Sequence, residues 1–200
     1  MKVEIRNDKV IIEGYVNAVE RESRPLITEK GRVNEKIKAG TWRKALKRAE
    51  NVNALLDHRA DKVLASTKEG TVTLDEDEIG LRATVVTADT ETMKKAREGK
   101  LKGWSFGMYV NEESYEERAN QLPLREVSDL DILEISIIDD EMTPCYAATS
   151  IETRAGEEKT IEKRSIESPA SVSITEKDID YSNYESRIKD LKSKSCAGTT

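Results

Sequence analysis

Ser105 is the residue whose setting in this sequence best suits nucleophilic chemistry. It lies in the segment 102–110, KGWSFGMYV, whose alternation of large and small side chains predicts a β-strand. Successive side chains point to opposite faces of a strand, so Ser105 shares its face with Gly103 and Gly107. Glycines inside a strand often mark the close approach of another backbone, so a peptide could reach this hydroxyl. The alternative is a barrel strand that bends at its glycines, with Ser105 an incidental small residue.

His58 is the single histidine of the chain. A serine becomes nucleophilic when a base takes its proton, and that base is most often an imidazole held by a third group. His58 ends the segment 52–58, which predicts a strand with an apolar row. A lone histidine at such a position can equally be structural, and both interpretations stay open. One histidine also argues against most metal sites, so we expect no metal and no other cofactor.

Glu134 is an acid in an unfavourable setting. The segment 129–139, DLDILEISIID, predicts a strand in which leucines and isoleucines surround this residue. An ionised carboxylate there is costly unless a donor or a cation meets it. Glu134 therefore needs a partner, which is either a lysine or arginine across the sheet or the imidazole of His58.

Composition limits the class of protein. Of 200 residues, 36% are hydrophobic and 36% are charged, and the net charge is -6. The apolar positions concentrate early, which predicts one domain over residues 1–152 and a polar extension over 153–200. The chain shows no basic stripe with interleaved aromatics and no long apolar run, so we expect a cytosolic protein that binds neither nucleic acid nor membrane. Cys145 and Cys196 lie far apart and are expected to be free thiols.

Periodicity and capping signals predict the remaining elements. One helix is expected to begin with Thr41 as its N-cap and another to run from Asp89 to Gly99. Residues 21–36 are expected to form a loop, and residues 112–120 to be helical or disordered. Further strands are expected within 3–19, 63–67, 71–74, 81–86 and 147–149.

The tail that follows Thr153 has a different composition. It is rich in Glu, Lys, Ser and Thr and has little to bury, which predicts a flexible linker. Within 176–194, apolar residues recur at three- and four-residue spacing, which is typical of an amphipathic helix. Such a helix is marginal alone and would order on a partner, so we expect it to dock the protein. The alternative is a tail with no role beyond solubility.

The chain order of a lone histidine, a serine between glycines and an acid in an apolar strand resembles the prohead proteases of tailed bacteriophages. These capsid maturation peptidases are distantly similar to the herpesvirus assembly protease. The resemblance covers about residues 10–150 and rests on the order and spacing of short words: NEKI and GTW within 34–42, LLDH and VL within 55–64, DEIGL at 77–81, GKLKGWSFGM at 99–108 and LEISI at 133–137. The chain departs from the family pattern at Ala65-Ser66 and in a distorted Pro-Ala word within 143–147.

The resemblance implies a fold and a catalytic set. The fold would be α+β with mainly antiparallel strands, a closed β-barrel surrounded by short helices, and a flexible C-terminal tail. Ser105 would be the nucleophile and His58 the base. The herpesvirus relatives use a second histidine, which this chain lacks, so a carboxylate must serve. We choose Glu134 over Asp131 and Asp57. The resemblance does not supply the oxyanion hole. Our own expectation for the oxyanion hole or the substrate site is Gly103, Gly107, Leu124 and Arg125, the last two from the loop 121–125.

The resemblance also implies a function. The chain would be a serine endopeptidase that cleaves scaffold segments of the major capsid protein, and its own tail, during capsid maturation. It would act inside the immature capsid, the prohead, in the cytoplasm of the bacterial host. Its partners would be the capsid protein, the scaffold segment and further copies of itself. The rival interpretation is a non-catalytic scaffolding or assembly protein on the same fold.

Overall fold

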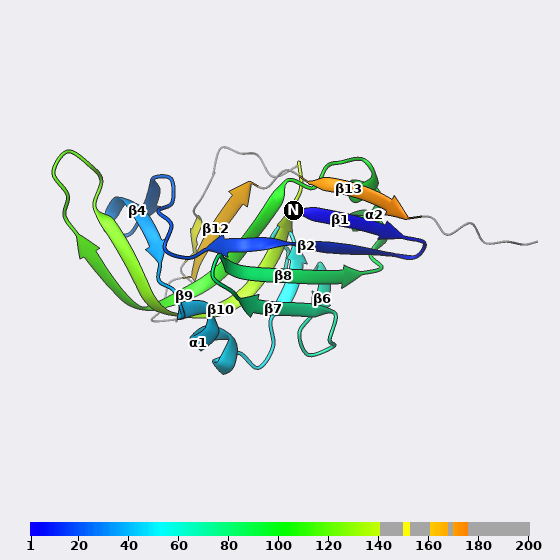
Figure 1. Cartoon of the computed structure of the whole chain (residues 1–200), viewed down its shortest axis with the longest axis horizontal. Helices are drawn as coiled ribbons and strands as arrows, with labels where there is room; N and C mark the ends of the chain where they lie inside the picture. Colours follow the sequence, from blue (N-terminus) through cyan, green and yellow to red (C-terminus); the bar gives the residue numbers. More distant parts are fainter. Residues whose placement is uncertain (141–149, 153–160, 168–169, 176–200) are drawn as a thin grey trace, which may run out of the picture.

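The computed structural model describes residues 1–140, 150–152, 161–167 and 170–175. Its strands form two sheets whose directions differ, with two short helices beside them (Figure 1). The first sheet has the order β13 (Ser171–Thr175), β1 (Lys2–Arg6), β2 (Lys9–Ala18), β8 (Gly80–Thr87) and β7 (Val72–Glu76). The second has the order β11 (Ser150–Glu152), β12 (Ile161–Glu167), β9 (Gly103–Glu116), β10 (Leu124–Ile138), β4 (Gly31–Ile37) and β3 (Leu26–Thr28), and β5 (Asn53–Leu56) with β6 (Val63–Ser66) extends it from β10. The helices are α1 (Thr41–Arg48) and α2 (Thr90–Arg97).

The expectation of a closed barrel is wrong. A barrel requires the first and last strands of a sheet to pair. In the described part of the chain, the first sheet ends at β13 and β7 and the second at β11 and β3, and no strand joins these edges. The sheets are also mixed, because β13 runs parallel to β1, and both β4 and β5 run parallel to β10. The long β10 pairs with β9 along one edge and with β4 and then β5 along the other, so it spans two shorter strands and leaves the sheet open.

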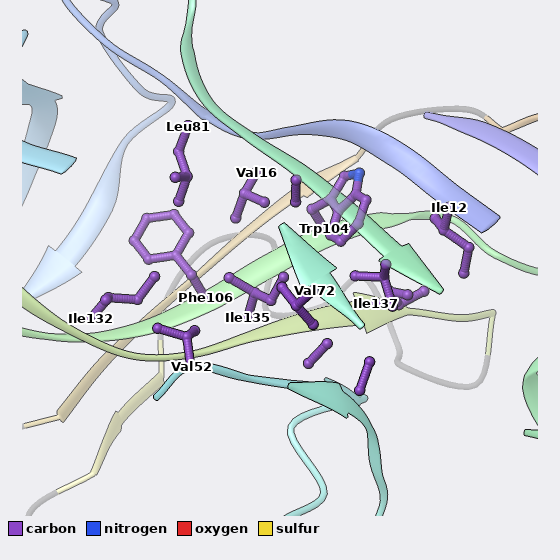
Figure 2. Close-up of a cluster of buried hydrophobic side chains, with 14 of the residues drawn as sticks. Ile12, Val16, Val52, Val72, Leu81, Trp104, Phe106, Ile132, Ile135 and Ile137 are labelled. Carbon is purple, nitrogen blue, oxygen red and sulfur yellow. The ribbon is translucent and has the colours of Figure 1, made fainter. Parts of the chain in front are cut away.

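A continuous apolar core lies between the sheets (Figure 2). The large side chains of β9 form its centre, since Trp104, Phe106 and Met108 are each 0% exposed. This is the apolar face that the alternation of the segment predicted. Trp42 of α1 packs its ring edge-on against Phe106, with 5.0 Å between ring centroids. The core therefore fixes which face of β9 points into it, and Ser105 lies on the opposite face, which other elements cover.

Helix α1 begins at Thr41, as expected, but Thr41 is not its N-cap. The capping position is Gly40, in the left-handed region with φ 87°, and no side chain at that position makes the cap. Glu76 at the end of β7 does so instead. Its carboxylate accepts from the Gly40 amide at 2.6 Å and from the Arg43 amide at 2.7 Å. An acid at a helix N-terminus also meets the positive end of the helix dipole, so this contact ties α1 to the first sheet.

Two segments form strands where other structures were expected. The β9 strand continues to Glu116 instead of giving way to a helix or to disorder, and β3 and all but the last residue of β4 lie within the predicted loop 21–36. Residues 111–116 of β9 lack the apolar alternation that signals a strand, whereas β3 and β4 carry it in part, with Leu26, Val33 and Ile37 buried. The β9 extension and β4 pair with β10, β3 pairs with β4, and ion pairs such as Lys30–Glu113, at 2.7 Å, add to this pairing.

The expectation of a flexible linker is wrong for residues 161–167 and 171–175, which form β12 and β13. These strands find backbone partners on the free edges of β9 and β1, which compensates for their polar composition. The domain boundary after residue 152 stays a prediction. The expected strand at 147–149, the expected helix within 176–194 and both cysteines lie outside the described residues.

The capping role of Glu76 is testable by denaturation. We expect Glu76→Ala to lower the free energy of unfolding by about 1–2 kcal/mol, because two amides at the start of α1 lose their acceptor. Urea denaturation followed by circular dichroism measures this. Glu78→Ala, which removes an exposed acid from the same turn, should change stability by no more than about 0.5 kcal/mol. Equal losses in the two variants would contradict the cap.

Candidate functional site

A tight turn after β5 sets the position of His58. The β5 strand lies parallel to β10, with Leu56 beside Ile137, and the Asp57 amide donates to the Ile137 carbonyl at 3.0 Å. The chain then turns at Asp57 and His58, whose φ values of 53° and 58° lie in the left-handed region. Residues with side chains adopt this region rarely, and such residues concentrate at functional sites. The turn places the imidazole over the acid of β10.

Three predicted site residues, Ser105, His58 and Glu134, lie in one hydrogen-bonded row. His58 Nε2 lies 2.6 Å from Ser105 Oγ, and His58 Nδ1 lies 2.7 Å from Glu134 Oε1. Ser105 is 0% exposed, and the side chains of His58 and Glu134 are 10% and 13% exposed. A carboxylate at Nδ1 favours the tautomer that carries its proton there, which leaves Nε2 to accept a proton from the serine. The three side chains come from β9, the turn after β5, and β10.

Ser136 is a member of the site that the sequence analysis missed. Its hydroxyl donates to Glu134 Oε2 at 2.6 Å and accepts from the backbone amide of His58 at 3.2 Å. It therefore fixes the second oxygen of the acid and the backbone of the histidine together. The available signal was its place two residues after Glu134, on the same face of a strand.

The other candidate acids lie elsewhere. Asp131 forms an ion pair with Arg48, at 2.9 Å, at an exposed position. Asp57 adjoins His58 in sequence, but its carboxylate accepts from the Asp139 amide at 3.0 Å. The acid in contact with the imidazole is Glu134.

The residues predicted for the oxyanion hole or the substrate site are dispersed. Gly107 faces Glu134, and a Cβ there would lie 2.9 Å from Glu134 Oε1, so this glycine makes room for the acid. Gly103 lies at the start of β9, between Ile138 of β10 and Glu167 of β12. Leu124 and Arg125 are buried at the start of β10, at the opposite end of that strand from Glu134. Of these four residues, Arg125 joins the charged cluster described below.

Strand β12 covers Ser105. It pairs antiparallel with the edge of β9 that β10 leaves free, with Ser165 opposite Ser105. The Ser105 hydroxyl lies 2.7 Å from the carbonyl oxygen of Arg164, and the Ser165 hydroxyl donates to Ser105 Oγ at 3.0 Å. Sequence reasoning missed this contact because it expected a linker here.

Beside this contact lies a buried cluster of four charged residues: Glu35 of β4, Arg125 of β10, and Glu162 and Arg164 of β12. Burial alone would lower the pKa of Arg125, but Glu162, Glu35 and Glu113 outweigh it and raise that pKa. Burial alone would raise the pKa of Glu162, but hydrogen bonds and charge from Arg125 and Arg164 hold that pKa below its ordinary value. The two arginines and Glu162 are thus stabilised in their charged forms by contacts within the cluster.

Asp57 lies beside a second buried ion pair, between Lys95 and Asp139. Burial raises the pKa of Asp57 to about 6 from an ordinary value of 3.8, and the Asp139 carboxylate adds to this. The hydrogen bond from the Asp139 amide and the charge of Lys95 act in the opposite direction. Asp57 is the residue that precedes His58 in the left-handed turn.

Within the described ranges, no group of three or more His, Cys, Asp or Glu residues is arranged to hold a metal ion. The two helices of the described part are eight residues each, and neither is long and apolar enough to cross a membrane.

A family model matches most of the chain. The family model of the caudovirus prohead serine protease matches residues 1–164, a span that includes Ser105, His58 and Glu134. No curated protein and no solved structure showed significant similarity to the chain.

The raised pKa of Asp57 predicts a pH-dependent stability. Between pH 4 and 6 the folded protein keeps a proton that the unfolded chain has released, so this group favours the folded state at low pH and loses that effect as pH rises through about 6. The stability of the wild type relative to Asp57→Asn should therefore fall from pH 4 to pH 7. Urea denaturation across this range measures the difference. Asp61→Asn, at an exposed position in the same turn, is the control. A constant difference between the wild type and Asp57→Asn would contradict the prediction.

Proposed function

Since this chain belongs to the caudovirus prohead serine protease family, we propose that it is a serine endopeptidase whose nucleophile is Ser105, whose general base is His58 and whose third member is Glu134. The observation that carries the proposal is the unbroken row of hydrogen bonds from Glu134 through the imidazole to Ser105. The family itself consists of serine peptidases of phage proheads.

In this mechanism, Ser105 Oγ attacks the carbonyl carbon of a peptide bond while His58 Nε2 accepts its proton. The same nitrogen then donates that proton to the leaving amine. Glu134 holds the Nδ1 proton and stabilises the imidazolium that forms in between. Ser136 and Gly107 support the acid, one by a hydrogen bond and the other by leaving space. A water molecule then hydrolyses the acyl-enzyme.

The proposed substrates are scaffold segments of the major capsid protein and the tail of the protease itself. Cleavage would take place inside the prohead, in the cytoplasm of the bacterial host, where the enzyme associates with capsid protein and with further copies of itself. Support for this part of the proposal comes from the family description, which names the prohead.

Covalent labelling tests the nucleophile. We expect a fluorophosphonate to modify the wild type at Ser105, and both Ser105→Ala and His58→Ala to lose labelling and to reduce peptide hydrolysis by about 10⁴-fold or more. Ser114→Ala, which removes an exposed serine from the same strand, should behave as the wild type. Mass spectrometry of the labelled peptide identifies the site. A wild type that neither labels nor hydrolyses peptides over prolonged incubation would favour the non-catalytic scaffolding alternative.

The space at Gly107 gives a second test. In Gly107→Ala, the added methyl group must displace the Glu134 carboxylate, because its carbon would lie only 2.9 Å from Glu134 Oε1. We expect turnover to fall by about 100-fold, as misplacement of about 1 Å commonly causes, with a smaller change in KM. Steady-state kinetics measures both constants, and circular dichroism checks folding. Unchanged turnover in a folded variant would show that the position of Glu134 is unimportant.

A further inference from the structure

Strand β12 lies where a substrate of this site would lie. It adds to the free edge of β9 as an antiparallel strand, from Glu162 opposite Met108 to Glu167 opposite Gly103. Extended peptides commonly bind proteins by adding a strand to an exposed edge, with main-chain hydrogen bonds giving affinity and side-chain contacts giving specificity. In Figure 1, β12 lies alongside β9, the strand that carries Ser105. The tail therefore occupies the position of a bound peptide.

The peptide bond nearest the nucleophile joins Arg164 to Ser165. Ser105 Oγ is 2.7 Å from the Arg164 carbonyl oxygen, and the carbonyl carbon is one C=O bond, about 1.23 Å, from that oxygen. The single proton of Ser105 has two acceptors in reach, this carbonyl and His58 Nε2 at 2.6 Å. When the Ser105 hydroxyl donates to His58 instead of to the Arg164 carbonyl, a lone pair of Ser105 Oγ can point toward the Arg164 carbonyl carbon.

The Arg164 side chain is held by a matching carboxylate. It is 4% exposed, and its guanidinium meets Glu35 of β4 through two bonds, Nε to Oε1 at 2.8 Å and Nη2 to Oε2 at 2.9 Å. Such a two-point contact suits arginine and carboxylate specifically. An uncharged residue at position 164 would leave Glu35 with less compensation in a buried setting. Glu35 therefore has the geometry of a residue that selects a basic side chain before the cut.

Glu162, two residues before Arg164, also makes a two-point contact with a residue of opposite charge, here Arg125. Its carboxylate accepts from Arg125 Nη1 at 2.6 Å and from Nη2 at 2.7 Å. Arg125 is 3% exposed and also contacts Glu35, at 2.9 Å, so the two recognition contacts form one cluster. The site thus matches an acidic and a basic residue at a spacing of two.

The sequence of the tail repeats this spacing. Each of the three arginines that follow Arg125 in the chain has Glu two positions before it and an apolar or aromatic residue three positions before it. The three words are Ile-Glu-Thr-Arg at 151–154, Ile-Glu-Lys-Arg at 161–164 and Tyr-Glu-Ser-Arg at 184–187.

We infer that β12 is a substrate held in the active site of its own chain, that the bond cut is Arg164–Ser165, and that Glu35 and Arg125 select the word Glu-x-Arg before the cut. The inference rests on the peptidase function proposed above. In the reaction, a bond forms between Ser105 Oγ and the Arg164 carbonyl carbon. The bond from that carbon to the Ser165 nitrogen breaks, and His58 passes the serine proton to this amine. Water then releases the Arg164 carboxylate and restores Ser105.

Intact mass of the full-length protein against time tests the bond. We expect the wild type to give fragments 1–164 and 165–200, and Ser105→Ala to stay whole at this bond. The half-time should not change over a tenfold dilution, because the substrate strand belongs to the same chain. Cleavage whose rate falls in proportion to dilution would contradict the inference that β12 is cut by its own chain, even if the bond cut were Arg164–Ser165.

Two variants test the selection. Arg164→Ala and Glu35→Gln should each slow the cut after residue 164 by at least about tenfold, because each removes one partner of a buried charge pair. The matched controls are Arg118→Ala, which removes the arginine of another Glu-x-Arg word in the β9–β10 hairpin, and Glu22→Gln, which removes its ion-pair partner. Both controls should cut at the wild-type rate.

Synthetic peptides make the test independent of protein folding. Wild-type protein should hydrolyse Ile-Glu-Lys-Arg-Ser-Ile-Glu after Arg, and replacing either the first Glu or the Arg by Ala should lower kcat/KM by at least about tenfold. Equal rates on the three peptides would overturn the selection. Fluorophosphonate labelling distinguishes a failure of this inference from a failure of the proposed peptidase function. A protein that labels at Ser105 but cuts elsewhere overturns this inference alone, whereas one that neither labels nor cuts overturns the peptidase function with it.

Discussion

The burial of one carboxylate, Glu134, is the constraint on which the rest of the site depends. A charged group in a strand of leucines and isoleucines must be met by donors, because its desolvation is otherwise too costly. The fold supplies two, the imidazole of His58 at one oxygen and the hydroxyl of Ser136 at the other. The absence of a side chain at Gly107 gives the carboxylate its space. The hydrogen bond between His58 and Glu134 therefore does two things at once: it compensates the buried carboxylate and it orients the imidazole toward Ser105.

Strand β10 makes that arrangement possible. It pairs with β9 on one edge and, in its second half, with β5 on the other, so the serine strand and the histidine strand are held at a set distance. The left-handed turn at Asp57 and His58 then brings the imidazole back over the sheet. Such backbone is costly, and the hydrogen bonds that the amides of Asp57 and His58 donate to the Ile137 carbonyl and the Ser136 hydroxyl hold it in place.

The charged cluster around Glu35 has a different meaning for the protein. Buried ion pairs are weak contributors to stability, because the loss of hydration offsets most of the attraction. Their two-point geometry is nevertheless highly selective. Half of this cluster, Glu35 and Arg125, belongs to the body of the protein, and the other half, Glu162 and Arg164, belongs to β12. A cluster divided in this way between a site and an added strand suits recognition better than stabilisation.

The sequence alone determined the local features. The alternation around Ser105 identified the face of β9 that packs into the apolar core. The apolar surroundings of Glu134 showed that it needs a partner, and the count of one histidine left no other imidazole to supply it. Tertiary structure decided what depends on contacts between distant segments. The sheets stay open, because β10 pairs with β4 and then with β5 along the same edge. The side chain that accepts hydrogen bonds from the amides at the start of α1 is that of Glu76, not the predicted Thr41. Tertiary structure also ordered β12, because the free edge of β9 and the charges of Glu35 and Arg125 compensate a polar segment that has too few apolar residues to order by itself.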